Sequence, residues 1–385
     1  MGIPIKGICE PEFAPVANVF EDNFKHQGEL GAACAVYVDG RKVVDLWGGY
    51  KDPKKETPWE ENTIAGFYSV GKAMAGLCVL QLVDSGHLEL DLPVCRWWPE
   101  FAVNGKEKVT IRQLLCHQAG LPAIRKRLPE DAMLNWQLMV QALAEETPWF
   151  PPGSKHVYHT NTYGFLTGEL VRRISGKGFG SYFKERISTP LKADVAFGLP
   201  EHDLPRVAEL VWHPSGGPPD PNILDRPMTE TERMVNHSYF NPSGFSSLGV
   251  MNTRRWRMAE VPSTNGHGSA RGIAKIYHIL AHGGTYKKDF LIGRHLLTEA
   301  TRVQSEGPCP ILERDVSFGL GFQITRPDRP FGPNKHSFGH YGTGGSLGFA
   351  DPDARLGFGY VMNDIIPRWR NTRNQALIDA IYKII

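Results

Sequence analysis

The chain has no excess of charge of one sign, no long apolar run and no closely spaced pair of cysteines, and each absence excludes a class of function. Lys and Arg together number 43 against 41 Asp and Glu, a formal net charge of +2, so we expect no binding of nucleic acid. The longest apolar stretch, residues 73–83, is too short to cross a bilayer, so we also expect no membrane insertion.

Signatures of disulfides and metal sites are missing as well. The six cysteines are scattered without a Cys-x-x-Cys pair, which indicates buried thiols in a reducing compartment. The 14 histidines are dispersed and no His-Glu-x-x-His motif occurs, so we predict neither a metal nor another cofactor. Residues 1–6 have no signal-peptide pattern, which predicts a cytoplasmic protein.

Strand-like segments lie near both ends of the chain, with helix-like segments between them. An Asp39-Gly40 turn joins two apolar strands in a hairpin. The predicted strands are 32–38, 42–47, 318–324, 338–349 and 356–362, and the predicted helices begin at Ser69 and Thr110 or span 136–145, 163–174, 181–187, 270–281 and 371–385.

This order predicts an α/β (α+β) fold, in which an antiparallel sheet flanked by helices is built from both termini and a mainly helical domain is inserted. We place the discontinuous α/β domain at 1–92 and 250–385. The helical domain then spans 93–249 and includes long loops over 200–245, where Pro, Gly and polar residues are frequent.

The most unusual stretch is Ser69-Val70-Gly71-Lys72. Three positions make about one helical turn, so the hydroxyl and the amine lie on one helix face. Because the apolar run follows at once, we expect burial, which favours a neutral amine that can take a proton from the hydroxyl. Alone, the pair also fits a helix cap beside a snorkelling lysine. A second copy, Ser181 with Lys184, is interpreted as a helix N-cap with a solvated lysine.

Two later segments carry groups that suit nucleophilic catalysis, although each alone also has a structural explanation. Tyr158 lies just before a predicted helix, where it is either a packed aromatic or a phenol facing a cleft; a nearby cationic lysine would favour the phenolate and make it a base. Residues 340–346 are glycine-rich, which is typical of a strand end or of close approach to a ligand. A backbone N–H there can form an oxyanion hole with the N–H of the nucleophilic serine.

Ser346 is a rival nucleophile, because residues 344–348 match Gly-x-Ser-x-Gly. That motif requires a strand, a turn and a helix around the serine and a histidine later in the chain. Strand and turn patterns follow Ser346, and no histidine follows residue 340. We therefore interpret Ser346 as structural or substrate-proximal.

In this order and at these separations, the motifs resemble the serine β-lactamase and penicillin-binding-protein superfamily, and most of all the class C β-lactamase-related esterases called family VIII carboxylesterases. The resemblance covers nearly the whole chain and includes residues 68–72, 117–122, 151–153, 158–164 and 339–349. It implies that Ser69 is acylated, that Lys72 helps to deprotonate it and that Tyr158 is the general base. It also implies an oxyanion hole from the N–H groups of Ser69 and Thr343, with His340, Tyr341 and Gly342 in place of the Lys-Thr-Gly motif.

Two departures from the family pattern bear on the substrate. Tyr158-His159-Thr160 stands for the frequent Tyr-x-Asn, with Asn161 one place late, and His340-Tyr341 stands for Lys-Thr. A mostly neutral imidazole beside a bulky phenol suits a substrate carboxylate less well than a lysine does. We therefore expect a serine carboxylesterase that acts on small-molecule, uncharged esters through an acyl-enzyme.

Alternatives remain open on the sequence. The same scaffold supports an acyltransferase, in which an alcohol or amine held by the 200–245 loops replaces water, or a β-lactamase or D-amino-acid peptidase. A non-enzymatic relative that keeps the fold as a binding module is a further class. The sequence leaves the oligomeric state unknown.

Overall fold

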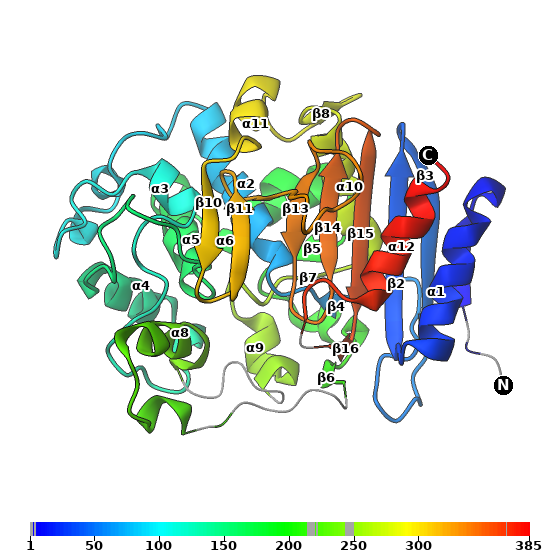
Figure 1. Ribbon diagram of the computed structural model, residues 1–385, viewed down its shortest axis with the longest axis horizontal. Helices are drawn as coiled ribbons and strands as arrows, with labels where there is room; N and C mark the ends of the chain where they lie inside the picture. The colour runs from blue at the N-terminus through cyan, green and yellow to red at the C-terminus, as the bar shows by residue number, and fades with distance from the viewer. Residues whose placement is uncertain (1–2, 4, 214–219, 221, 243–249, 367) are drawn as a thin grey trace.

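Nine strands form one antiparallel sheet, in the order β1-β3-β2-β15-β14-β13-β12-β11-β10 (Figure 1). The computed structural model describes residues 3, 5–213, 220, 222–242, 250–366 and 368–385. The nine strands are β1 (Ile5–Cys9), β2 (Gly31–Val38), β3 (Arg41–Gly49), β10 (Ser305–Cys309), β11 (Arg314–Phe318), β12 (Gln323–Ile324), β13 (Phe338–Tyr341), β14 (Leu347–Asp351) and β15 (Leu356–Met362). Because β2 pairs with β15, the sheet is built from both termini, as predicted.

The C-terminal strands show where the sequence patterns mislead. β15 has the predicted bounds, but the predicted single strand 338–349 is wrong, because β13 and β14 form a hairpin there. Gly344 and Gly345 adopt φ values of +88° and +111°, which reverse the chain between the two strands. The predicted strand 318–324 is also wrong in its centre, because β11 ends at Phe318 and β12 begins only at Gln323. β1 was not predicted.

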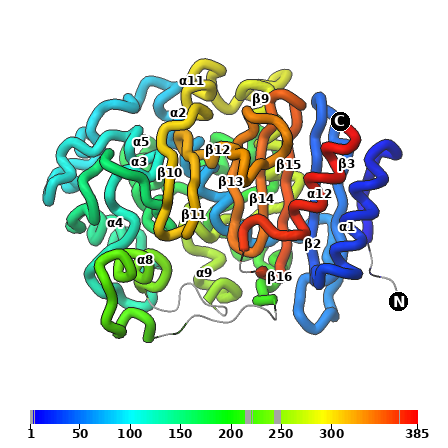
Figure 2. The backbone as a smooth tube through the Cα atoms, viewed as in Figure 1, coloured from blue at the N-terminus to red at the C-terminus, as the bar shows by residue number. Residues whose placement is uncertain are grey.

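Helices cover both faces of the sheet. Helices α1 and α12 lie side by side on one face (Figure 2), and α10 packs on β15 and β2 from the other (Figure 1). The helices are α1 (Ala14–His26), α2 (Val70–Asp84), α3 (Ile111–Leu115), α4 (Trp136–Glu145), α5 (Thr162–Ser175), α6 (Phe179–Phe183), α7 (Thr189–Leu191), α8 (Glu230–Phe240), α9 (Arg254–Met258), α10 (Ala270–Ala281), α11 (Arg294–Ala300) and α12 (Thr372–Tyr382). Short strands complete the list: β4 (Ala65–Gly66), β5 (Val195–Ala196), β6 (Val211–Trp212), β7 (His267–Gly268), β8 (Thr285–Tyr286), β9 (Asp289–Phe290) and β16 (Asp364–Ile365).

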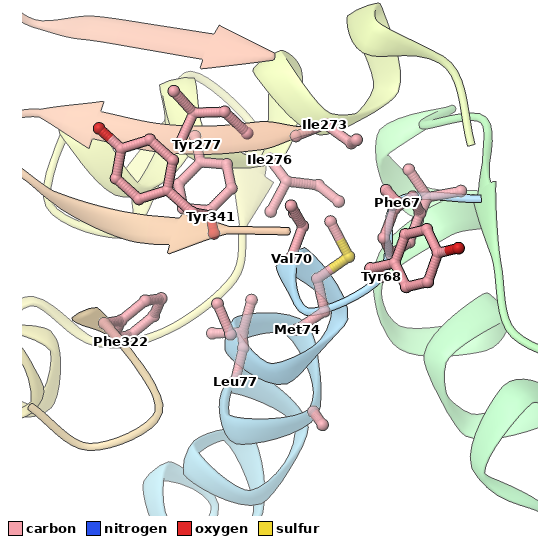
Figure 3. Close-up of a cluster of buried hydrophobic side chains, with 14 of the residues drawn as sticks. Phe67, Tyr68, Val70, Met74, Leu77, Ile273, Ile276, Tyr277, Phe322 and Tyr341 are labelled. Carbon is pink, nitrogen blue, oxygen red and sulfur yellow. The ribbon is translucent and has the colours of Figure 1, made fainter. Parts of the chain in front are cut away.

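Helix α2 is buried along almost its whole length, as the apolar run predicts. Val70, Met74 and Leu77 follow a helical spacing and point toward the sheet and α10 (Figure 3). Phe67 and Tyr68 precede the helix in the same cluster of buried side chains. The polar start of α2 therefore lies inside the protein and not on its surface.

Several helix predictions are confirmed and two are wrong. Helices α4 and α10 have the predicted bounds, and Thr110 forms a capping box with Gln113 at the start of α3. Ser181 is not an N-cap, because α6 already begins at Phe179 after Gly178. The loops predicted over 200–245 include helix α8, whose N-cap Thr229 makes its own capping box; residues 214–219, 221 and 243–245 lie outside the described residues.

The longest helix, α2, has 15 residues, and none of the helices in the described ranges is both long and apolar enough to cross a membrane. All six cysteines are free, and four of them are buried. A cytoplasmic location stays a prediction of the sequence.

Candidate active site

Ser69 occupies the turn that leads into α2. Tyr68 immediately before it has a φ of +48°, a left-handed conformation that is costly for a residue with a large side chain. Ser69 is the N-cap residue, yet its hydroxyl makes no capping bond to the helix backbone. The residue is only 3% exposed. The strained turn thus holds a buried hydroxyl at the helix start and leaves it available for other partners.

Lys72 provides the partner. Its Nζ atom lies 3.0 Å from Ser69 Oγ and donates a second hydrogen bond of 3.0 Å to the carbonyl oxygen of Ser263. The side chain is fully buried and forms no ion pair with a carboxylate among the described residues. Burial therefore lowers the pKa of Lys72 well below its ordinary 10.5. A neutral amine beside the hydroxyl is the arrangement that the Ser-x-x-Lys spacing predicts.

Tyr158 reaches the same place from the segment before α5. The Nζ atom of Lys72 lies 4.8 Å from the centre of the tyrosine ring. The ring packs against Trp369 at 5.2 Å and stacks on Phe318 at 6.0 Å between ring centres. Its hydroxyl is buried and makes no hydrogen bond of normal geometry with a described residue, although the Ser69 hydroxyl lies near enough to lower the pKa of the phenol.

The electrostatics around Tyr158 differ from the sequence-based expectation. Burial raises the pKa of Tyr158 well above 10, and the Ser69 hydroxyl only partly offsets this. The expected phenolate needs a cationic lysine, but burial drives the Lys72 amine toward its neutral form. Burial therefore favours a neutral amine and a neutral phenol at this site.

Three buried histidines, His117, His159 and His340, lie around Lys72 and Tyr158 and are also uncharged. Burial lowers the pKa of His340 to about 3 and that of His159 to about 4, and it lowers the pKa of His117 well below 6.5. His117 accepts a hydrogen bond of 3.1 Å from the His159 backbone N–H, and its ring lies 5.0 Å from that of Tyr158. These rings fix the position of Tyr158 without adding charge.

The turn between β13 and β14 brings the third motif to the nucleophile. A Cβ atom on Gly342 would lie 2.4 Å from the carbonyl oxygen of Phe67, so only glycine permits this approach to the segment before Ser69. Thr343 follows and is half-buried. Neither its backbone N–H nor that of Ser69 donates a hydrogen bond within the described ranges. Both N–H groups of the predicted oxyanion hole thus belong to adjoining segments and are unused.

His340 and Tyr341 point to opposite faces of β13, as neighbouring strand residues do. His340 faces the site: its ring lies 6.1 Å from that of Tyr158. Its Nδ1 donates to the Tyr341 carbonyl oxygen at 2.7 Å, which leaves Nε2 as a buried acceptor with no partner among the described residues. Tyr341 instead stacks on Phe331 at 5.0 Å, away from the Ser69 hydroxyl.

The rival serines have other surroundings. Ser346 immediately precedes β14 and donates a 2.9 Å hydrogen bond to the Phe67 carbonyl oxygen, so it ties the glycine-rich turn to the segment that carries Ser69. A strand and not a helix comes directly after Ser346, which agrees with its interpretation as structural. Ser181 and Lys184 are both exposed, so that copy lacks a desolvated amine.

Sequence reasoning missed two contributors to the site. Ser263 anchors Lys72 through a backbone carbonyl, which every residue type has, so no sequence signal marks it. Trp369 covers Tyr158 and His340 from the segment before α12, far from both in sequence.

Asn161, the displaced residue of the second motif, donates its side-chain amide to the Ser238 carbonyl oxygen at 3.1 Å. In the described part of the chain, no group of three or more His, Cys, Asp or Glu side chains could hold a metal ion.

The beta-lactamase family model matches residues 16–382. The chain belongs to the beta-lactamase family. This family member is 32% identical over 393 residues to the esterase/beta-lactamase LipL of Mycobacterium tuberculosis, a match that covers 100% of this chain and 88% of LipL. Its structure is similar to that of a family VIII carboxylesterase, with 36% identity, 100% of both chains covered and a TM-score of 0.91.

A second solved structure, a penicillin-binding protein homologue from Caulobacter crescentus, is 38% identical with a TM-score of 0.90, and the match covers 99% of this chain and 100% of the homologue. These comparisons confirm the superfamily and the esterase branch that the sequence motifs indicate.

Proposed function

We propose that this protein is a serine carboxylesterase that forms an acyl-enzyme on Ser69. The observation that carries the proposal is the fully buried Lys72 amine, held 3.0 Å from the Ser69 hydroxyl with no carboxylate partner among the described residues. A desolvated neutral amine at this distance is a base for the hydroxyl. The names of its relatives, an esterase/beta-lactamase and a family VIII carboxylesterase, support the same class of reaction.

In acylation, Lys72 takes the Ser69 proton while Oγ forms a bond to the ester carbonyl carbon. The N–H groups of Ser69 and Thr343 would receive the negative charge that develops on the carbonyl oxygen. When the tetrahedral intermediate collapses, the bond to the alcohol oxygen breaks and the proton passes to that oxygen. In deacylation, water replaces the alcohol, the same groups move its proton, and a carboxylic acid leaves.

Tyr158 acts in this scheme as a proton relay. Its neutral hydroxyl both donates and accepts, and Lys72 and Ser69 are both near it. The relay needs no phenolate, so the raised pKa of Tyr158 is compatible with the role. The unpaired acceptor Nε2 of His340 faces the same ring and can orient the phenol.

Hydrolysis of β-lactams is the second candidate, because LipL is named as an esterase and a beta-lactamase. The uncharged His340 makes it the weaker one, since a neutral imidazole offers no charge to a substrate carboxylate.

The test is a screen of p-nitrophenyl esters of increasing acyl length beside the β-lactam nitrocefin. We expect ester turnover with a burst of one p-nitrophenolate per enzyme where deacylation is slow. Ser69→Ala should abolish turnover, whereas Ser346→Ala should retain most of it. The opposite pattern would place the nucleophile at Ser346, and turnover of nitrocefin alone would favour the second candidate.

A further inference from the structure

A small pocket beside the third motif is lined by arginines. Its volume is about 30 Å³, and it lies between β11, β12 and the segment that leads to β13. Its lining includes Arg314, Arg326, Arg329, Asp315, Phe331 and Tyr341, and Arg370 lies beside it, next to Tyr341. The pocket is therefore formed on the side of β13 that Tyr341 faces, opposite to His340.

The charges in this pocket are not balanced. Arg326 pairs with Asp315 and Asp328, but Arg314 and Arg329 have no carboxylate partner among the described residues. Arg370 has no carboxylate partner there either, and its Nε atom is buried with no hydrogen-bond partner among the described residues. Burial lowers the pKa of both Arg314 and Arg329, and the like charges lower them further, Arg329 acting on Arg314 and Arg370 acting on Arg329.

Tyr341 supplies an independent observation. The residue is 4% exposed, and its hydroxyl makes no hydrogen bond of normal geometry with any described residue, the Arg370 guanidinium being the nearby donor. Arg370, Arg329 and Arg314 are the charged groups around it. Three half-buried guanidinium groups that have no carboxylate partner among the described residues, beside a buried hydroxyl, favour an anion that joins them.

The pocket adjoins the proposed site through one side chain. The Arg314 guanidinium lies over the Trp369 ring at 4.8 Å, and that ring lies 5.2 Å from Tyr158 and 5.9 Å from His340. One ring, that of Trp369, thus separates Tyr158 from the Arg314 guanidinium.

We propose that Arg314, Arg329, Arg370 and Tyr341, the arginine pocket, bind a free carboxylate on the ester substrate, an inference that rests on the proposed esterase activity. A carboxylate accepts paired hydrogen bonds from a guanidinium and a further one from the phenol. His340 alone predicts uncharged ester substrates. With the arginine pocket we expect anionic esters, because the neighbouring arginines carry the positive charge that His340 lacks.

The first experiment compares kcat/KM for the p-nitrophenyl monoester of glutaric acid with kcat/KM for p-nitrophenyl butyrate. A second pair, 4-acetoxybenzoate and its methyl ester, places the carboxylate in the alcohol half. We expect the anionic member of at least one pair to be preferred. Arg329→Gln should reduce that preference by about tenfold or more, mainly through KM. Arg302→Gln, at an exposed arginine that pairs with Glu299, should leave it unchanged.

Tyr341→Phe keeps the ring packing and removes only the hydroxyl, so it tests the pocket even if Arg329→Gln folds poorly; it should reduce the same preference severalfold. The pocket is refuted if neutral esters are cleaved and neither anionic ester is preferred in the wild type, or if both variants leave the preference intact.

Binding of glutarate to Ser69→Ala, measured by calorimetry, separates the two levels of the proposal. Glutarate should bind, and binding should weaken when Arg329→Gln is added. Glutarate binding without cleavage of any ester by the wild type would contradict the esterase and keep the anion pocket. Ester cleavage without glutarate binding would contradict the pocket alone.

Discussion

Replacing Lys72 by Met tests the base and the burial of its amine in one variant. Met has a similar length and no charge, so it should fill the space around α2 with little strain. If Lys72 is the base for Ser69, kcat/KM should fall by about 10²–10⁴-fold, or about 3–5 kcal/mol of transition-state stabilisation. The assay is steady-state hydrolysis of the best p-nitrophenyl ester from the screen.

The same variant should change the pH dependence of stability. The folded-state pKa of Lys72 lies well below 10.5, so between these two values the unfolded chain binds the extra proton. Wild-type stability therefore rises with pH through that window, by about 1.4 kcal/mol per pH unit from this residue alone. Lys72→Met lacks this pH-dependent contribution to the unfolding free energy. The difference in unfolding free energy should thus shift in favour of the variant by about 1.4 kcal/mol per unit as the pH falls from 10.

Lys106→Met is the matched control. Lys106 is also buried and bonds backbone carbonyls of Val103 and Glu146, but it lies away from Ser69 on another segment. It should cost stability and leave kcat/KM within a few fold. Retained activity in Lys72→Met would exclude Lys72 as the base for Ser69. A stability difference from the wild type that does not change with pH would mean that Lys72 is protonated in the folded protein.

Three further substitutions follow from single contacts. Tyr158→Phe should lower kcat at least about 100-fold and leave the melting temperature nearly unchanged, because the hydroxyl makes no hydrogen bond of normal geometry among the described residues. A fully active variant would exclude the relay. Ser346→Ala removes the hydrogen bond to Phe67, so denaturant unfolding should show a loss of about 1–3 kcal/mol, and unchanged stability would contradict its structural role. Thr110→Ala breaks the capping box of α3 and should cost about 1 kcal/mol in the same assay, with activity retained; a neutral effect would argue against the cap.

The parts of the fold that the sequence predicts best are those with one strong local signal. Helices α4 and α10 and strand β15 each combine the right periodicity with clear end residues, and their bounds agree with the prediction. The β13–β14 hairpin was missed because apolar residues on both sides of the glycines continue one strand-like pattern. Helix α8 was missed because its polar composition resembles that of the loops around it.

In the site, too, the features set by local spacing were predictable and those set by long-range packing were not. The spacing of Ser69 and Lys72 fixes their contact, since one helical turn sets it locally. Tyr158 depends on long-range packing, yet its motif was sufficient to identify it as a candidate. The neutral state of Lys72 and the arginine pocket depend on burial and on which charges meet, and neither quantity is local in sequence.

Mass-spectrometric mapping of a fluorophosphonate probe tests the central claim most directly. Such a probe phosphonylates an activated serine hydroxyl and stays attached. We expect a single adduct on the peptide that contains Ser69, lost in Ser69→Ala and formed much more slowly in Lys72→Met. An adduct on Ser346, or no adduct on the folded protein, would contradict it.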